Sequence, residues 1–291
     1  MVSNAVVEHS RGVPVSPPWG DVGRNATLGI VSMGSKFLLQ WLNTYTTTNL
    51  TTLQAAVSHR SQGRGLLTVC NHTSTLDDPV VMSNLMPWSF FASESQHKGN
   101  RWSFCAREIC FKGKLLGQFF LNGKTLPIER GQGLQQPAMQ TAAQLLARGD
   151  WVHLFPEGRV GFSGRLQPCK WGVGKLVCDS VLQSGRDPEI LPFYHSGMAR
   201  IMPEHGRIPR VGQTVAVTVG DPIDVSDLTC HCSEGSTEVW KAITERICSK
   251  LHELEDAAPP NPNQMRERKL KPEHTDGRVE KQDPVLPEQR L

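Results

Sequence analysis

Short apolar runs of strand length alternate with longer amphipathic segments through the middle of this 291-residue chain. The runs have four to six residues, are largely apolar, and have turn-forming residues nearby, which is typical of strands. They lie at 65–70, 125–128, 151–155, 189–194 and 214–219. Segments predicted as helices lie between or after them, at 133–148, 170–183 and 236–254. This order predicts an α/β fold in which helices flank a central mixed sheet.

The two ends of the chain differ in composition from this middle part. Residues 257–291 are rich in Pro, Asn, Gln, Lys, Arg and Glu, have few apolar side chains to bury, and resemble residues 1–24 in this respect. Such segments cannot bury enough apolar surface to offset the entropy lost on ordering. We therefore predict disordered segments at 1–24 and 257–291, and one folded domain at 25–256.

The first part of this domain, residues 26–57, is predicted to contain a helix with one broad apolar face. The apolar residues are Leu28, Val31, Met33, Phe37, Leu38, Trp41 and Leu42. Ser32, Ser35, Lys36 and Gln40 interrupt the run, so it falls short of the roughly 20 consecutive apolar residues that a membrane span needs. Two interpretations stay open. Either the helix lies in the plane of a membrane interface with Trp41 at headgroup level, or it packs on the domain's own core.

Charge and hydropathy exclude some classes of protein. The formal charge of +3 and the pI near 8.4 are too mildly basic for a dedicated nucleic-acid binder. A mean hydropathy of −0.33 excludes a protein with many membrane spans. A weak attraction to anionic lipid surfaces is compatible with these values.

The eight cysteines are scattered and form no C-x-x-C pair. This pattern predicts reduced thiols in a chain that is not built on disulfides. Cys230, His231 and Cys232 are adjacent, so they cannot all face one tetrahedral ion, and we predict a surface loop without a metal.

The segment 71–77, with sequence NHTSTLD, is the most informative one for chemistry. His72 follows a predicted strand, and a turn would bring Asp77, five residues later, against its imidazole. Such a carboxylate fixes the ring tautomer and stabilises the imidazolium, so the other ring nitrogen can take a proton from an alcohol. The alternative is a loop histidine, with Asp77 or Asp78 only capping the helix that starts near Pro79.

Two further segments place polar residues at strand ends, where open α/β sheets bind ligands. The sequence FPEGR at 155–159 puts Arg159 where its guanidinium could bind a phosphate, and Gly158 would let the backbone approach closely. The sequence GKTLPIERG at 123–131 contains a strand ending in Arg130. Its Gly-Lys-Thr resembles the end of a nucleotide-binding P-loop, but Gln118 stands where a P-loop needs glycine, so a P-loop is excluded. A serine hydrolase is also excluded, because no G-x-S-x-G elbow occurs.

In this order the segments resemble the glycerolipid acyltransferase superfamily, whose blocks are N-H-x-x-x-x-D, a glycine-containing strand ending in Arg, and F-P-E-G-[RK]. Further matches narrow the resemblance to the members that remodel cardiolipin by transacylation. The matching segments are 71–79, 110–111, 123–131, 155–160, 170–172, 190–192 and 195–198. The chain departs from the pattern at Arg107, where related sequences tend to have a small residue.

The resemblance implies a role for each matching residue. His72 would be the general base that deprotonates a glycerol hydroxyl, and Asp77 would orient it. Arg130, Glu157, Gly158 and Arg159 would hold the phosphate and glycerol of the acceptor. A packing or lipid-positioning role is expected for His195.

The resemblance also implies substrates and a location. The donor would be a phospholipid and the acceptor a lysophospholipid such as monolysocardiolipin, without coenzyme A, metal or bound cofactor. The protein would lie on mitochondrial membranes facing the intermembrane space, as a peripheral or monotopic protein. Two alternatives stay open: a lysophospholipid acyltransferase that uses acyl-coenzyme A, and a non-catalytic lipid-binding protein. Whether the chain self-associates is open as well.

Overall fold

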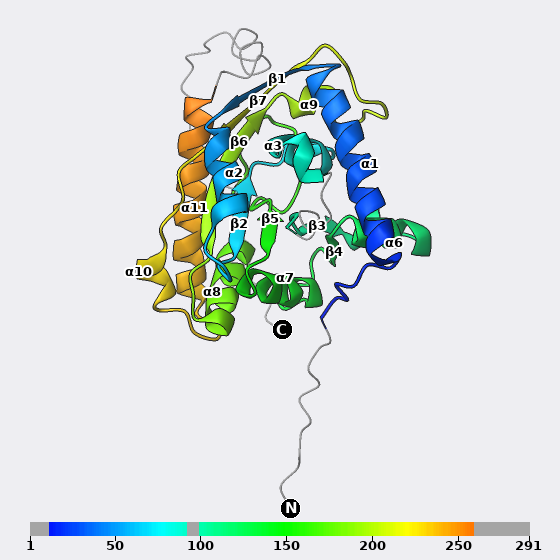
Figure 1. Cartoon of the computed structure of the whole chain (residues 1–291). Coiled ribbons are helices and arrows are strands. Elements are labelled where there is room, and N and C mark those ends of the chain that lie inside the picture. The colour runs from blue at the N-terminus through cyan, green and yellow to red at the C-terminus, as the bar shows by residue number, and fades with distance from the viewer. Residues whose placement is uncertain (1–11, 92–98, 259–291) are drawn as a thin grey trace, which may run out of the picture. The chain divides into compact units, whose positions relative to one another are not determined.

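Five strands form the central sheet of the computed structural model, which describes residues 12–91 and 99–258 (Figure 1). In sheet order they are β1 (Thr44–Thr48), β7 (Thr214–Val219), β6 (Glu189–Ser196), β2 (Leu66–Cys70) and β5 (Trp151–Leu154). All neighbours pair in parallel except β6 and β7, which are antiparallel. The predicted mixed sheet is therefore confirmed.

A second pair of parallel strands, β3 (Ser103–Ala106) and β4 (Thr125–Ile128), continues this sheet. The residue before β3, Trp102, forms a parallel bridge with Val152 of β5. Its backbone N–H donates to Trp151 O at 2.8 Å, and its carbonyl accepts from His153 N at 2.7 Å. The carboxyl ends of β2, β5, β3 and β4 therefore follow one another along a single edge.

Helices cover both faces of the sheet (Figure 1). One face packs on α7 (Pro137–Ala147), α8 (Gly172–Ser184) and α11 (Thr237–Ala257), and the other on α2 (Leu50–His59) and α3 (Met82–Leu85). Leu67 and Val69 of β2 face the first group, whereas Leu66 and Cys70 face the second, as the two-residue period of a strand requires. The short elements are η1 (Asp77–Val81), η2 (Trp88–Phe91), α5 (Arg107–Cys110), α6 (Lys114–Asn122), α9 (Met198–Ile201) and α10 (Ser226–Thr229).

The predicted strands and the three long helices are all present, but two strands escaped prediction. β1 has the sequence TYTTT and is mostly exposed at the sheet edge, so it lacks the apolar signal of a buried strand. It lies inside 26–57, where we expected helix. β3 has only four residues, SFCA, and its two middle residues are only partly buried, so it lacks the apolar run of a buried strand. The helix expected from Pro79 instead begins at Asp77 with the π-helical turn η1.

The N-terminal helix α1 (Gly20–Gln40) starts inside the segment predicted as disordered and ends well before residue 57. Its polar residues Thr27, Ser32, Ser35 and Lys36 are buried, and Lys36 Nζ donates to Met86 O at 2.6 Å. Leu28 and Leu39 are buried with them, but several other large apolar side chains point outward. The exposed ones on α1 and in the residues that flank it are Trp19, Val22, Ile30, Met33, Phe37, Trp41 and Leu42. Of the polar residues that break the apolar run, Ser32, Ser35 and Lys36 thus face the domain. Within the described residues, no helix is long and apolar enough to cross a membrane.

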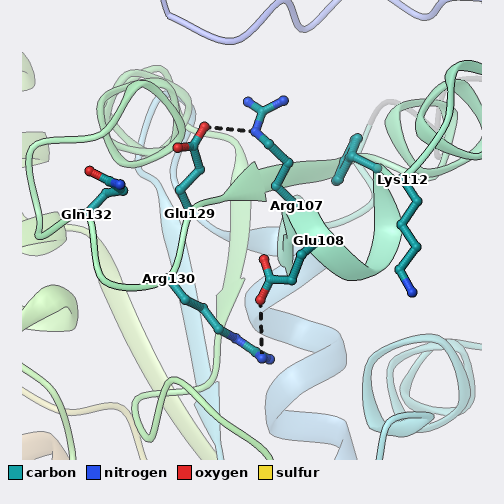
Figure 2. A pocket seen from close by; sticks show the side chains of 7 residues that line it. Arg107, Glu108, Lys112, Glu129, Arg130 and Gln132 are labelled. Atoms are coloured by element: carbon teal, nitrogen blue, oxygen red, sulfur yellow. Dashed lines mark ion pairs between the residues drawn. The ribbon is translucent and has the colours of Figure 1, made fainter.

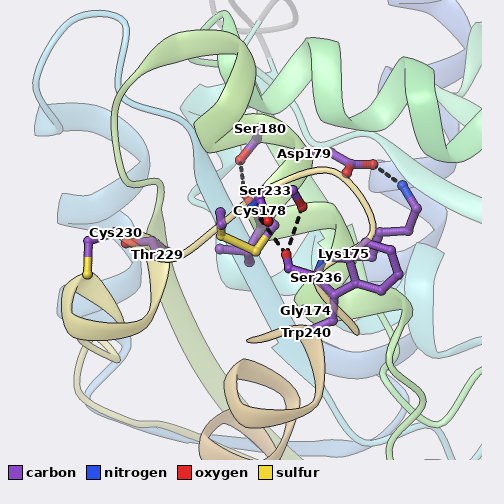
Figure 3. Close-up of a disulfide and its surroundings, with 12 residues drawn as sticks. Gly174, Lys175, Cys178, Asp179, Ser180, Thr229, Cys230, Ser233, Ser236 and Trp240 are labelled. Atoms are coloured by element: carbon purple, nitrogen blue, oxygen red, sulfur yellow. Dashed lines mark hydrogen bonds and ion pairs between the residues drawn. A yellow bond between two sulfur atoms is a disulfide. The ribbon is translucent and has the colours of Figure 1, made fainter. Parts of the chain in front are cut away.

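The prediction of reduced thiols throughout is wrong. Cys105 of β3 is bonded to Cys110 of α5, and Cys178 of α8 is bonded to Cys232, in the loop after α10 (Figure 3). Partners 54 residues apart cannot be identified from spacing alone, because tertiary packing brings them together. Cys230 is free and exposed. No group of three His, Cys, Asp or Glu side chains in the described residues could hold a metal ion.

Candidate active site

His72 and Asp77 come together at the carboxyl end of β2. The imidazole Nδ1 lies 3.0 Å from Asp77 Oδ2, and the side chains are 17% and 1% exposed. Nδ1–H donating to the carboxylate leaves Nε2 as the basic nitrogen. Nε2 has no hydrogen-bond partner among the residues that the structure describes. The arrangement can therefore accept a proton from a hydroxyl group.

Asp77 is held by the backbone of the turn before it. Its Oδ2 accepts hydrogen bonds from Thr73 N at 2.6 Å and Ser74 N at 2.8 Å, in addition to His72. The helix N-cap is Leu76, which makes no capping bond. The alternative interpretation, in which this carboxylate only caps a helix, is wrong for Asp77. Asp78 does not cap either, since it pairs with Arg101 at 2.8 Å and accepts from Ser103 Oγ at 3.0 Å.

Glu157, from the loop after β5, fixes the backbone of His72. Its Oε1 accepts from His72 N at 2.5 Å and its Oε2 from Gln167 N at 2.8 Å, and the residue is 1% exposed. Burial raises the pKa of this carboxyl group to about 7, against its two backbone hydrogen bonds and the nearby imidazole, which lower it. Gly161 N donates to His72 O at 2.7 Å, so the same loop forms hydrogen bonds with both the backbone N–H and the backbone carbonyl of His72. Both Glu157 oxygens accept from backbone N–H groups, which gives this residue a positioning role in addition to its predicted contact with the acceptor.

Aromatic rings pack against the imidazole of His72. Phe155 stacks on His72 with ring centroids 3.9 Å apart and planes at 13°. Buried His153 touches Phe155 edge-on at 4.7 Å, and its Nδ1 lies 2.9 Å from Thr68 Oγ1. Burial lowers the pKa of His153 to about 3, so it is a neutral packing residue. These contacts restrict the rotamer of His72, which keeps Nε2 in one place.

Asn71 and His195 join β2 to β6 behind the pair. Asn71 Nδ2 donates to His195 O, and His195 N donates to Asn71 Oδ1, both at 2.9 Å. His195 Nε2 lies 2.9 Å from Asn71 O and 3.5 Å from Asp77 Oδ2. Gly197 adopts a left-handed φ of 95°, and a Cβ there would lie 2.0 Å from Thr214 O. The fully buried His195 is thus part of the support of the site, in line with the expected packing role.

The remaining predicted residues lie in two places. Gly158 and Arg159 are exposed beside Glu157, and Gly158 has a φ of 64°, which favours glycine. Arg130 lies after β4, in a pocket lined also by Arg107, and its Nη1 lies 3.3 Å from Glu108 Oε1 (Figure 2). That these residues together hold the acceptor stays a prediction.

Sequence reasoning missed several supporting residues. Asn71, Phe155, Asp78 and Arg101 all contact the catalytic turn or its neighbours. Asn71 and Phe155 stood inside the quoted motifs, which was the available signal. The pairing of Asp78 with Arg101 spans a stretch of chain that has no motif.

Comparison with known proteins identifies the family of the chain. Residues 46–196 match the family model described as acyltransferase. The chain is 35% identical to tafazzin of Drosophila melanogaster over 77% of its own length and 58% of that protein. It is 33% identical to taffazin of Dictyostelium discoideum, over 75% of this chain and 81% of that one. With the N-acylphosphatidylethanolamine synthase of Arabidopsis thaliana it shares 36% identity, over 70% and 72% of the two chains.

A solved structure shares the fold. The 1-acyl-sn-glycerophosphate acyltransferase PlsC of Thermotoga maritima superposes with a TM-score of 0.54 at 16% identity, covering 81% of this chain and 83% of that one. The α/β core with a histidine and aspartate at the end of β2 defines the class of the glycerolipid acyltransferases. The chain belongs to this family, and its relatives place it with the tafazzins.

Proposed function

We propose that this protein transfers a fatty acyl group from a phospholipid to the hydroxyl of a lysophospholipid, without coenzyme A, and so remodels cardiolipin. The observation that carries the proposal is the imidazole of His72, oriented by Asp77 at 3.0 Å and fixed on both sides of its backbone. The similarity to tafazzins supports the choice of lipids. The mitochondrial membrane location is part of the same proposal.

The reaction needs one group that takes up a proton and later returns it. His72 Nε2 takes the proton of the acceptor hydroxyl while its oxygen attacks the ester carbonyl of the donor. The tetrahedral intermediate collapses with cleavage of the donor ester bond. The leaving lysolipid oxygen takes the proton back from the imidazolium, which Asp77 stabilises in between. An ester is exchanged for an ester, so the step is reversible.

The exposed apolar face of α1 supports binding to a membrane interface. Ile30, Met33, Phe37 and Trp41 are each more than half exposed. Leu115 and Leu116 of α6 are exposed as well, and Arg24 of α1 donates to Leu121 O of α6 at 3.3 Å. Two neighbouring helices thus present apolar side chains to the outside, as interfacial helices do. Of the two interpretations of the N-terminal helix, this favours the in-plane anchor.

The activity is tested with the purified protein, a lysolipid acceptor and either labelled phosphatidylcholine or acyl-coenzyme A. We expect label transfer from phosphatidylcholine, and none after His72→Ala. His59→Ala, at an exposed histidine on α2, is the matched control and should retain full activity. Transfer from acyl-coenzyme A alone would establish the coenzyme-dependent alternative, and unchanged activity of His72→Ala would reject the proposed base.

The anchor is tested by sedimentation with vesicles. Phe37→Ser combined with Trp41→Ser should reduce vesicle binding at least tenfold, because two large apolar side chains leave the interface. Ile208→Ser, at a residue that is 79% exposed outside α1, should leave binding unchanged. Equal binding of all three proteins would place the membrane contact elsewhere.

A further inference from the structure

Two free cysteines lie in contact between the loop that follows β5 and the last helix. Cys169 belongs to the loop between β5 and α8, and Cys248 to the second half of α11. Their side chains are hydrogen-bonded to each other, although the two residues are far apart in the sequence. Both are partly exposed, whereas the free Cys70 is buried. Small molecules in solution can therefore reach this pair of thiols.

The groups around the Cys248 sulfur favour its thiolate form. The sulfur accepts a hydrogen bond from the Cys169 side chain, a second from the Cys169 backbone, and a third from the ring of His252, one helical turn further along α11. His252 Nδ1 in turn lies 3.2 Å from Glu255 Oε2. These contacts, above all the one with the Cys169 side chain, lower the pKa of Cys248 to about 6, against partial burial, which raises it. At neutral pH such a cysteine is largely a thiolate, which is the nucleophilic form.

Cys169 has the opposite environment. Its hydrogen bond to Cys248 raises the pKa of its thiol well above the usual range, and partial burial and the nearby carboxyl group of Glu157 act in the same direction. Cys169 therefore keeps its proton and is the donor in the hydrogen bond. A thiolate in contact with a protonated thiol is the arrangement of a redox pair, in which one sulfur attacks an oxidant and the other then attacks the oxidised sulfur.

Hydrogen bonds that involve no sulfur hold the loop with Cys169 in place. Leu166 N donates to Glu255 Oε1 of α11 at 2.9 Å, and Gln167 N donates to Glu157 Oε2 at 2.8 Å. The loop is thus fixed to α11 on one side and to the support of the active site on the other. A bond between the two sulfurs would add a covalent link between this loop and α11.

We propose that Cys248 is a modification site that reacts with peroxides, and that Cys169 then converts the product into a disulfide within the chain. The inference goes beyond acyl transfer and stands whether or not the proposed reaction takes place.

The chemistry has two steps. With hydrogen peroxide, the thiolate of Cys248 attacks one oxygen, the O–O bond breaks, and Cys248 becomes a sulfenic acid as hydroxide leaves. The sulfur of Cys169 then attacks the Cys248 sulfur, the S–O bond breaks, and water leaves with the proton of Cys169. Two cysteines are thereby oxidised to one disulfide, and one peroxide is reduced. Because the two thiols are already in contact, the second step requires no large rearrangement of the fold.

The test treats the purified full-length protein with a small excess of hydrogen peroxide at pH 7. Remaining thiols are blocked with iodoacetamide, and the peptides are identified by mass spectrometry without reduction. We expect a new disulfide between Cys169 and Cys248, formed before Cys230 is oxidised. Cys230 is the internal control, because it is also free and is more exposed than either member of the pair.

Single variants separate the roles of the two cysteines. In Cys169→Ser the sulfenic acid of Cys248 has no partner thiol, so dimedone should label Cys248 after peroxide treatment. In Cys248→Ser the oxidation of Cys169 should be at least about tenfold slower than in wild type, because the thiolate is gone. His252→Gln should slow formation of the disulfide at least about threefold, because one donor to the thiolate is weakened. Cys230→Ser should match wild type.

Three outcomes would overturn the proposal. The first is oxidation of Cys248 no faster than that of Cys230. The second is a Cys169→Ser protein that is folded by circular dichroism but in which dimedone does not label Cys248. The third is a peroxide-induced disulfide that joins Cys248 to a cysteine other than Cys169.

Discussion

Replacing Asp77 by Asn removes one charge from the site and keeps its shape. Oδ2 accepts three hydrogen bonds, from His72, Thr73 and Ser74, whereas buried Oδ1 has no partner among the described residues. In Asp77→Asn the amide oxygen can take the place of Oδ2, and its NH₂ group then occupies the place of Oδ1. His72 keeps its position but loses the anion that stabilises its protonated form.

The magnitude follows from these contacts. Two charge-assisted backbone hydrogen bonds become neutral, at about 1 kcal/mol each, and a buried amide N–H without a partner adds about 1–3 kcal/mol. We expect the free energy of unfolding to fall by about 3–5 kcal/mol. The rate should fall further, by about 10³–10⁴-fold in kcat, because the imidazolium formed during transfer is no longer stabilised.

Urea unfolding followed by circular dichroism measures the first quantity, and transfer from labelled phosphatidylcholine measures the second. Asp221→Asn, at an exposed aspartate, is the control and should match wild type in both. A folded Asp77→Asn protein with kcat within tenfold of wild type would refute the reasoning, since the carboxylate would then be dispensable.

Two further predictions concern stability. Glu157 has its pKa raised from 4.5 to about 7, so its protonated form stabilises the fold fully below pH 4.5 and this contribution is lost as the pH rises to 7. Urea titrations should show wild type losing on the order of 2 kcal/mol over this range relative to Glu157→Gln, and parallel curves would contradict the raised pKa. Cys178→Ala opens a link between residues 54 apart and should cost about 4 kcal/mol without reductant. Chemical unfolding equal to that of wild type would show that the disulfide does not form.

The sequence determined the catalytic turn and the parallel core of the sheet. His72 and Asp77 are five residues apart and follow a short apolar strand, so local turn geometry brings them together. The apolar pattern of the sequence predicts the buried strands and the helices α7, α8 and α11. The strands are short apolar runs, and each of these helices packs an apolar side on one face of the sheet.

Tertiary structure decided what lies around that turn. The contacts of Glu157 with the His72 backbone, of Asn71 with His195 and of Cys178 with Cys232 join residues 54 to 124 positions apart. No local pattern encodes such pairs. The sequence left open which way the apolar face of α1 points, because that depends on which side of the helix the domain covers, and the domain covers the side with Lys36.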